Sequence, residues 1–325
     1  MRVRVLGLLI GGIVASLFSS TLPTATVVPA AADSTTPPFV NWATLLPSLI
    51  DAYQPNSANE CVAGRPGCVE STTAEMQRRF GPLAASCDHN AVFSLAYLRT
   101  TQTYKWARDQ QGFFNDTPWV NHEDAVFAKY YFQAYDNYQA GNVGAVPAAW
   151  RIAFAASASH QVTAQGDLLL GMNAHVNRDL PFVLAAIGIT TPDGTTRKPD
   201  HDKVNQFLNA VVQPLLVEIA ARFDPSATAI QTPYGVGYTA LFQLLAAWRE
   251  LAWRNAELLA DAPDSLSRSV VAEQIEANAA AQAQALVLTN SYIPLLQSSA
   301  GRDAYCAAHF NDPAPMLYPF GSAAS

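Results

Sequence analysis

The stretch from Gly166 to Pro181 sets polar side chains into a strongly apolar run at helical spacing. In a helix, Asp167, Gly171, His175 and Asp179 would form one stripe, because positions four apart lie on the same face. Leucine, methionine and valine residues cover much of the remaining surface, so we expect this helix to be buried on several sides. A buried imidazole or carboxylate needs a partner, since an isolated buried charge is strongly disfavoured. The stretch therefore predicts either a buried hydrogen-bond network or a metal site.

The rest of the chain shares this helical character. No run shows sustained alternation of apolar and polar residues, no hairpin signal separates β-branched runs, and no internal repeat is present. Long stretches such as 234–260 are apolar all round, which is typical of buried helices. We expect an all-α fold, a single orthogonal bundle-like domain over residues 33–325 with an irregular tail from about residue 290.

The N-terminus has the features of a secretory signal peptide. Arg2 and Arg4 precede an apolar run from Val5 to Phe18, and small residues follow as far as Ala32. We expect cleavage after Ala32 and a location outside the cytoplasm, extracellular or in the cell envelope. An N-terminal membrane anchor is the alternative, although the run is short for a span of about 20 residues. No later run approaches that length, so we expect no transmembrane segment in the mature chain.

The chain is acidic, which bears on its partners. Its formal net charge is −7, and removal of residues 1–32, which hold two arginines and no Asp or Glu, makes it −9. Such a chain with few clustered basic residues is a poor ligand for nucleic acid backbone. We expect a small-molecule or lipid-like partner and no nucleic acid; the oligomeric state stays open.

Four cysteines in an exported chain favour two disulfides. Cys61 and Cys68 bracket a short Gly/Pro-containing loop and are expected to pair, which leaves Cys87 to pair with Cys306. Other connectivities are open, since four cysteines allow three. A Cys/His zinc site is a further alternative, disfavoured by the export signal and by the lack of a CxxC pair.

Histidines next to carboxylates supply the candidate chemistry. Helix-borne His and Asp one turn apart can share a metal, or the Asp can orient the ring. Helical bundles commonly build metal sites from such groups on facing helices. The candidate metal ligands are His89, His122, His175 and Asp179, and the candidate catalytic residues are Asp124, Asn173 and Asn177.

Simpler explanations compete with this site. Asn121 is a plausible N-cap, which would put Glu123 and Asp124 in the first turn of a helix. Acidic side chains there interact favourably with the helix dipole. His160 and His309 lack a carboxylate setting and are expected to be structural. No HExxH, no GxSxG and no phosphate-binding glycine loop is present.

Three segments carry a family resemblance: Cys87-Asp-His, GMNAHVNRDLP from Gly171 to Pro181, and Trp248-Arg-Glu-Leu-Ala-Trp. Together they resemble a bacterial domain-of-unknown-function family of secreted helical proteins, over most of the chain after residue 32. The resemblance implies a helical fold and singles out the segment around His175. That family has no established activity.

A more distant analogy connects the chain with zinc-dependent phospholipase C and S1/P1 nuclease enzymes, which are secreted and all-α. His175 and Asp179 match the HxxxD ligand pairs of that class. The chain departs from it at the N-terminal Trp ligand, where position 33 is Asp, and in lacking a GDxxQPxH segment.

Two functions follow as hypotheses. The first is a metal-dependent hydrolase of esters or phosphoesters, in which a divalent metal such as zinc activates water and Asp124 is a further ligand or general base. The second is a non-catalytic binding protein for an apolar or lipid-like ligand. In that case His175 and Asp179 form a buried network that fixes the helix register.

Overall fold

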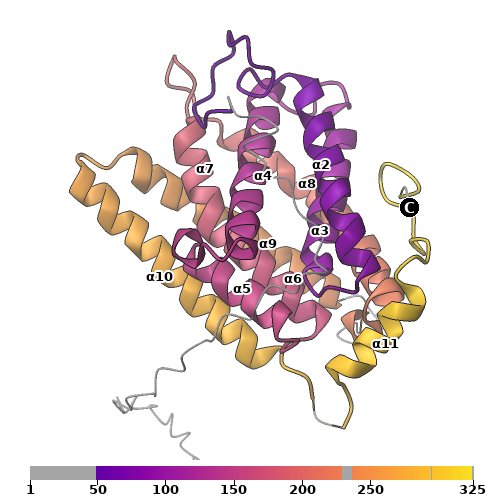
Figure 1. The fold of residues 1–325 in the computed structure, drawn as a ribbon. Coiled ribbons are helices and arrows are strands. Elements are labelled where there is room, and N and C mark those ends of the chain that lie inside the picture. Colours follow the sequence, from indigo (N-terminus) through magenta and orange to yellow (C-terminus); the bar gives the residue numbers. More distant parts are fainter. Residues whose placement is uncertain (1–48, 229–235, 294, 324–325) are drawn as a thin grey trace, which may run out of the picture. The chain divides into compact units, whose positions relative to one another are not determined.

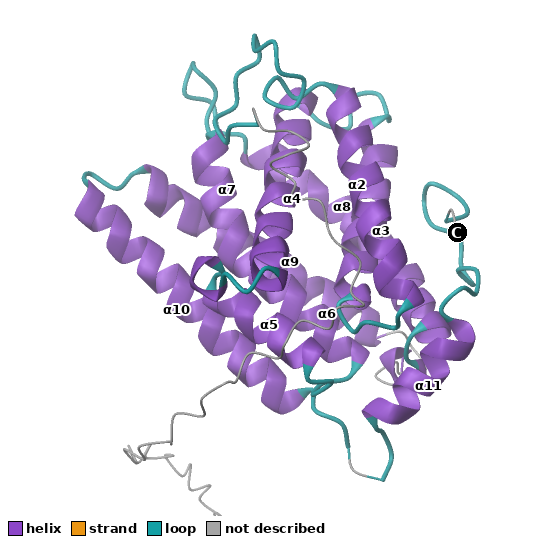
Figure 2. Ribbon diagram, in the orientation of Figure 1, coloured by secondary structure: helices purple, strands orange, loops and turns teal. Residues whose placement is uncertain are grey.

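The computed structural model describes residues 49–228, 236–293 and 295–323. The expected signal peptide, residues 1–32, and the expected start of the domain at residue 33 lie outside these ranges. Within them the chain is helical, and β pairing is limited to isolated bridges such as Val162 with Ser291. Figure 2 shows helices joined by loops throughout. The predicted all-α fold is confirmed.

The helices are labelled in Figure 1 in chain order. Their bounds are α2 (Pro66–Ala85), α3 (Ala91–Arg108), α4 (Thr117–Gln139), α5 (Ala148–Ala158), α6 (Ala164–Met172), α7 (Leu180–Ile187), α8 (Lys198–Arg222), α9 (Val236–Ala260), α10 (Ser265–Thr289) and α11 (Ser299–His309). A π-helical segment, η2 (Asn173–Asp179), joins α6 to α7, and short 3₁₀ turns lie at Val143–Ala145 and Pro225–Thr228.

The segment that carries the polar stripe is enclosed by other helices. The π-helical segment η2 packs against α4, α5, α9 and α10. Its winding follows from the sequence, because Pro181 has no N–H to donate to the preceding turn. The N–H of Leu180 instead donates to the carbonyl of His175, five residues earlier, which is the hydrogen bond of a π-helix. Single π-turns of this kind occur often at functional sites.

Helix α4 begins earlier than expected. Asp116 caps it by accepting a hydrogen bond from the N–H of Trp119, and Pro118 lies in the first turn, where a missing N–H costs nothing. The expectation that Asn121 caps this helix is therefore wrong. Glu123 and Asp124 lie inside the helix, so neither is needed to cap it.

Both predicted disulfides are present. Cys61 pairs with Cys68, and Cys87 pairs with Cys306 across 219 residues of sequence. The second bond attaches α11 to the turn before α3. The part of the chain beyond residue 290, expected to be irregular, thus contains a helix, which Ser298 caps at the N–H of Gly301.

Helix α8 is the one described helix that is long and apolar enough to cross a membrane. However, 56% of its most apolar window is buried inside the fold, which is also typical of a core helix. Its contacts with α3 and α9 place it in the wall of the cavity described next.

Candidate functional site

The site is built around the pair formed by His175 and Asp179, one turn apart on η2. Nδ1 of His175 lies 3.1 Å from Oδ2 of Asp179. Asp179 also accepts hydrogen bonds from Nε1 of Trp150 at 2.8 Å and from Nη1 of Arg178 at 2.9 Å. With an arginine and an indole as donors, Asp179 serves as a hydrogen-bond acceptor. The predicted pairing of these two residues is thus present as a hydrogen bond.

Aromatic side chains hold the imidazole of His175 in place. The ring stacks on Phe127 with centroids 3.4 Å apart and an interplanar angle of 3°, and it meets Tyr97 edge-on at 4.5 Å. Burial lowers the pKa of His175, although the bond to Asp179 acts in the opposite direction. The ring is therefore neutral near pH 7.

Beside this ring lies a cavity of about 140 Å³. Its walls come from α3, α4, α6, η2, α8 and α9, and most of the side chains that line it are apolar or aromatic. Phe93, Tyr97 and Phe127 form the wall next to His175, and Val204, Leu215 and Leu241 belong to the part contributed by α8 and α9.

Several polar atoms of cavity-lining residues are buried without a hydrogen-bond partner among the described residues. They are the hydroxyls of Tyr97 and Thr101, Oε2 of Glu123, Oδ2 of Asp124 and Nε2 of His175. A buried polar atom left unpaired costs about 1–3 kcal/mol. Their concentration at one cavity marks it as a place where the protein accepts a cost in stability, as functional sites do.

The two acidic groups of the cavity are strongly perturbed. Burial raises the pKa of Asp124 to about 8, with a further contribution from the charge of Glu123. Burial likewise raises the pKa of Glu123 to about 7, opposed by the positive charge of Arg249. The cavity thus offers an oriented proton acceptor at His175 and carboxyl groups that hold their protons near neutral pH. Such a combination suits general acid–base chemistry or hydrogen bonding to an uncharged molecule.

Residues 69–289 match the family of unknown function DUF5995. The chain belongs to this family. No curated protein and no solved structure matches the chain. The DUF5995 match contains all residues that line the cavity, together with the His175–Asp179 pair, and it ends before α11. The cavity is therefore built entirely from the part of the chain that defines the family.

Five of the predicted site residues are not among those that line the cavity: His89, His122, Asn173, Asn177 and Asp179. Both ring nitrogens of His122 face backbone carbonyls, of Cys61 at 2.8 Å and of Asp51 at 2.6 Å. A backbone carbonyl lies at hydrogen-bond distance from each ring nitrogen and occupies the position that a metal would need, so His122 joins the disulfide loop to α4. Asn173 donates to the carbonyl of Ala279, and Asn177 donates to Asn173. The two asparagines thus hold η2 against α10.

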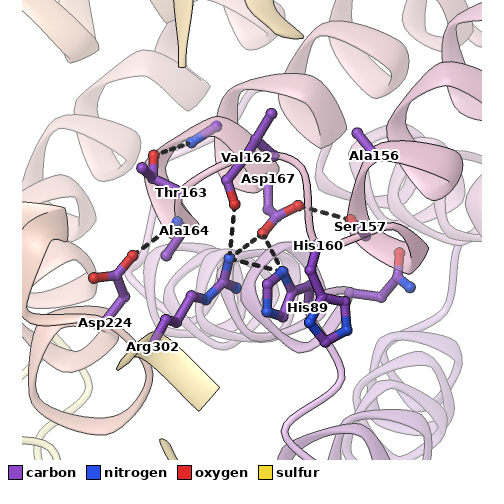
Figure 3. Close-up of polar contacts among 12 residues, drawn as sticks. His89, Ala156, Ser157, His160, Val162, Thr163, Ala164, Asp167, Asp224 and Arg302 are labelled. Atoms are coloured by element: carbon purple, nitrogen blue, oxygen red, sulfur yellow. Dashed lines mark hydrogen bonds and ion pairs between the residues drawn. The ribbon is translucent and has the colours of Figure 1, made fainter. Parts of the chain in front are cut away.

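His89 lies in a separate cluster near the C-terminal helix (Figure 3). Its Nε2 is 2.9 Å from Oδ1 of Asp303, and the other oxygen of Asp303 is 3.0 Å from Nδ1 of His160. The rings of His89 and His160 stack with centroids 4.0 Å apart. On the opposite side, Nη1 of Arg302 donates to Nδ1 of His89 at 3.0 Å and to Asp167 at 2.6 Å.

This cluster is the one group of three ligand-type side chains, among the described residues, whose atoms are close enough to hold a metal. His89 belongs to it; His122, His175 and Asp179 do not. Because Arg302 donates to Nδ1, the proton of neutral His89 lies on Nε2, the nitrogen that a metal would need. A metal-bound histidine normally donates its other N–H to an acceptor, and here that nitrogen faces an arginine. The cluster therefore fits a divalent metal poorly.

Several members of these clusters are not among the residues predicted from the sequence. His160, expected to be structural, contacts Asp303, and Arg302 and Asp303 lie in the part of the chain expected to be irregular. Glu123, expected in the first turn of a helix, lies inside α4 and lines the cavity. The signal that could have found Arg302 and Asp303 is their nearness to Cys306, since the predicted bond to Cys87 places α11 beside Asp88-His89.

Gly171 lets α6 approach α3 at the wall of the site. A Cβ at this position would lie 2.3 Å from the ring of Phe93, the same ring that packs on His175 at 5.8 Å. We expect Gly171→Ala to lower the free energy of unfolding by about 1–3 kcal/mol, because Phe93 is packed too tightly to yield. Urea denaturation measures this.

A matched glycine gives the control for this prediction. Gly81 lies inside α2, and nothing lies within 4 Å of the Cβ that an alanine would add there. Gly81→Ala should therefore stabilise the protein by up to about 1 kcal/mol through helix propensity. Equal effects of the two substitutions would contradict the close approach at Gly171.

Proposed function

We propose that this protein binds a small, largely apolar molecule in the central cavity and contacts its polar group through His175, Asp124 and Glu123. The observation that carries the proposal is the coincidence of a mainly apolar cavity with several buried polar atoms that have no hydrogen-bond partner among the described residues. Binding sites for small molecules typically combine a mainly apolar lining with a few convergent polar groups.

The size of the cavity limits the ligand. A cavity of about 140 Å³ is close to engineered apolar cavities of about 150 Å³ that bind benzene. A ligand with one aromatic ring or a short branched chain would fill it without large movement of the walls. A ligand with a long acyl chain would exceed this volume.

A metal-dependent hydrolase has less support from the geometry. Of the four predicted metal ligands, His122 is bound to carbonyls, His175 and Asp179 pair with each other, and His89 faces Arg302. The polar groups at the cavity, His175, Glu123 and Asp124, do not form a group able to hold a metal among the described residues. The geometry therefore favours an apolar ligand.

We further propose that the protein works outside the cytoplasm. The apolar segment after Arg2 and Arg4 supports this, and so do two disulfides with no free cysteine among the described residues. Disulfides form and persist in oxidising compartments. Mass determination of the exported protein would test cleavage after Ala32.

Filling the cavity should abolish binding. Val211 lines the cavity from α8, and Val211→Phe would place a ring inside it. We expect toluene to raise the melting temperature of the wild-type protein, since a ligand that binds the folded state stabilises it. In the Val211→Phe variant this shift should disappear.

The same substitution at an exposed site is the control. Val270 lies on α10, is 57% exposed and is no part of the cavity, so Val270→Phe should keep the toluene-induced shift. A wild-type protein that responds to none of toluene, phenol and indole, or a Val211→Phe variant that responds normally, would refute the proposal.

A further inference from the structure

The tautomer of His175 follows from its hydrogen bonds. Both oxygens of Asp179 already accept hydrogen bonds, Oδ2 from Trp150 and Oδ1 from Arg178, so Asp179 is the acceptor in its contacts. The contact of 3.1 Å between Asp179 and His175 therefore requires Nδ1 of the imidazole to carry the hydrogen. In a neutral ring the remaining nitrogen, Nε2, is then a lone-pair acceptor and cannot donate.

The ring cannot readily turn over to exchange its two nitrogens. Phe127 lies flat against one face at 3.4 Å, and Tyr97 and Phe93 contact it edge-on. His175 itself is only 3% exposed. The direction of the Nε2 lone pair is thus set by the fold before any ligand binds. This reduces the conformational entropy that the side chain loses on binding.

Nε2 differs from the other unpaired atoms around the cavity. The hydroxyls of Tyr97 and Thr101 can donate or accept, and so can a protonated carboxyl group of Asp124. Nε2 can only accept. A ligand that has only acceptors could form hydrogen bonds with the hydroxyls of Tyr97 and Thr101 but would leave Nε2 unpaired. A ligand with a hydroxyl group could donate a hydrogen bond to Nε2.

The lining of the cavity favours a neutral ligand. A cation would meet Arg249, which lines the cavity and is 5% exposed, and an anion would lose its hydration among side chains that are mostly apolar. Arg249 donates to Asn205 and to the carbonyl of His201, and no carboxylate within 4.0 Å neutralises it among the described ion pairs.

We propose that the ligand is a small, neutral, apolar molecule with a hydroxyl group, and that this hydroxyl donates a hydrogen bond to Nε2 of His175. The inference rests on the proposed function, because it names the chemistry of the ligand that the cavity binds. His175 is the residue that selects among apolar molecules of equal size.

A series of matched one-ring probes tests this by calorimetric titration of the wild-type protein at pH 7. Phenol has the hydroxyl group, anisole keeps the oxygen without a donor, toluene has neither, and benzylamine is cationic. We expect phenol to bind about tenfold more tightly than anisole or toluene. Hydrophobicity alone would give the reverse order, because phenol is the best hydrated of the three neutral probes.

Two variants assign the preference to Nε2. His175→Asn keeps an amide N–H near the position of Nδ1, so Asp179 retains its donor, but it removes the distant acceptor. His175→Gln reaches the position of Nε2 with an amide oxygen. We expect the preference for phenol over anisole to fall below twofold in His175→Asn and to be kept in part in His175→Gln.

A measurement on the wild-type protein tests the proposal even if the variants fail to fold. In the wild-type protein, the ¹⁵N resonance of Nε2 of His175 should shift on addition of phenol and should not shift on addition of toluene. Equal binding of the three neutral probes, tightest binding of benzylamine, or a phenol preference that survives in His175→Asn would overturn the inference and leave the proposed function standing. Binding of none of the probes would refute the proposed function itself.

Discussion

Replacing Asp124 with asparagine is expected to stabilise the protein by up to about 5 kcal/mol at pH 8 and by less than about 1 kcal/mol at pH 4. In the folded protein, burial raises the pKa of this carboxyl to about 8, whereas an unfolded aspartate titrates near 3.9. A raised pKa contributes stability that is fully present below the unfolded pKa and is lost as pH rises towards the folded one. Asparagine has nearly the same shape and no such loss.

Urea denaturation of the wild-type and Asp124→Asn proteins between pH 4 and pH 8 measures this effect. The difference in the free energy of unfolding should grow by about 1.4 kcal/mol per pH unit over most of this range. Asp261→Asn, at an exposed position, is the control and should show no comparable trend. A difference that stays constant with pH would show that Asp124 ionises normally in the folded protein.

A gain in stability from removing an acidic side chain would also bear on function. Natural proteins retain residues that lower their stability mainly where a functional site requires them. We therefore expect Asp124→Asn to be stable while the affinity for phenol changes, since the carboxyl group of Asp124 borders the same cavity as His175.

Removing the Cys87–Cys306 disulfide is expected to lower the stability of the protein by a large amount. Its loop of 219 residues is long, so the bond removes much conformational entropy from the unfolded chain, up to about 5 kcal/mol in the chain-entropy description. The double variant Cys87→Ala/Cys306→Ala should lose a large part of this stabilisation. It should also free α11 and expose the contact between Arg302 and Asp167 to solvent.

The other disulfide is the natural control. Cys61 and Cys68 are 7 residues apart, and the same description gives only about 2 kcal/mol for so short a loop. Chemical denaturation of the two double-alanine variants compares them directly. If the Cys61→Ala/Cys68→Ala variant were the less stable of the two, local packing and not loop closure would decide the contribution of these bonds.

The cavity itself could not be found from the sequence. Its walls come from helices spread between Phe93 and Arg249, and each contributes side chains that read as ordinary core residues. Only packing reveals that these side chains leave a space. The same holds for Glu123 and Asp124, whose importance depends on α4 beginning at Thr117, as set by the cap at Asp116.

Local spacing and composition predicted the all-α fold, and they favoured the disulfide pairing that the structure shows over the two other connectivities. They also determined the pairing of His175 with Asp179, because residues four apart on a helix meet whatever surrounds them. The tertiary structure alone decided which atoms are left without partners. It placed His122 against carbonyls and His89 against Arg302 and Asp303, and it left Nε2 of His175, a residue that lines the cavity, without a partner among the described residues. Burial and pairing depend on residues that are distant in the chain. For this reason the sequence predicts a set of metal ligands along this helix, whereas the structure shows one oriented hydrogen-bond acceptor, Nε2 of His175.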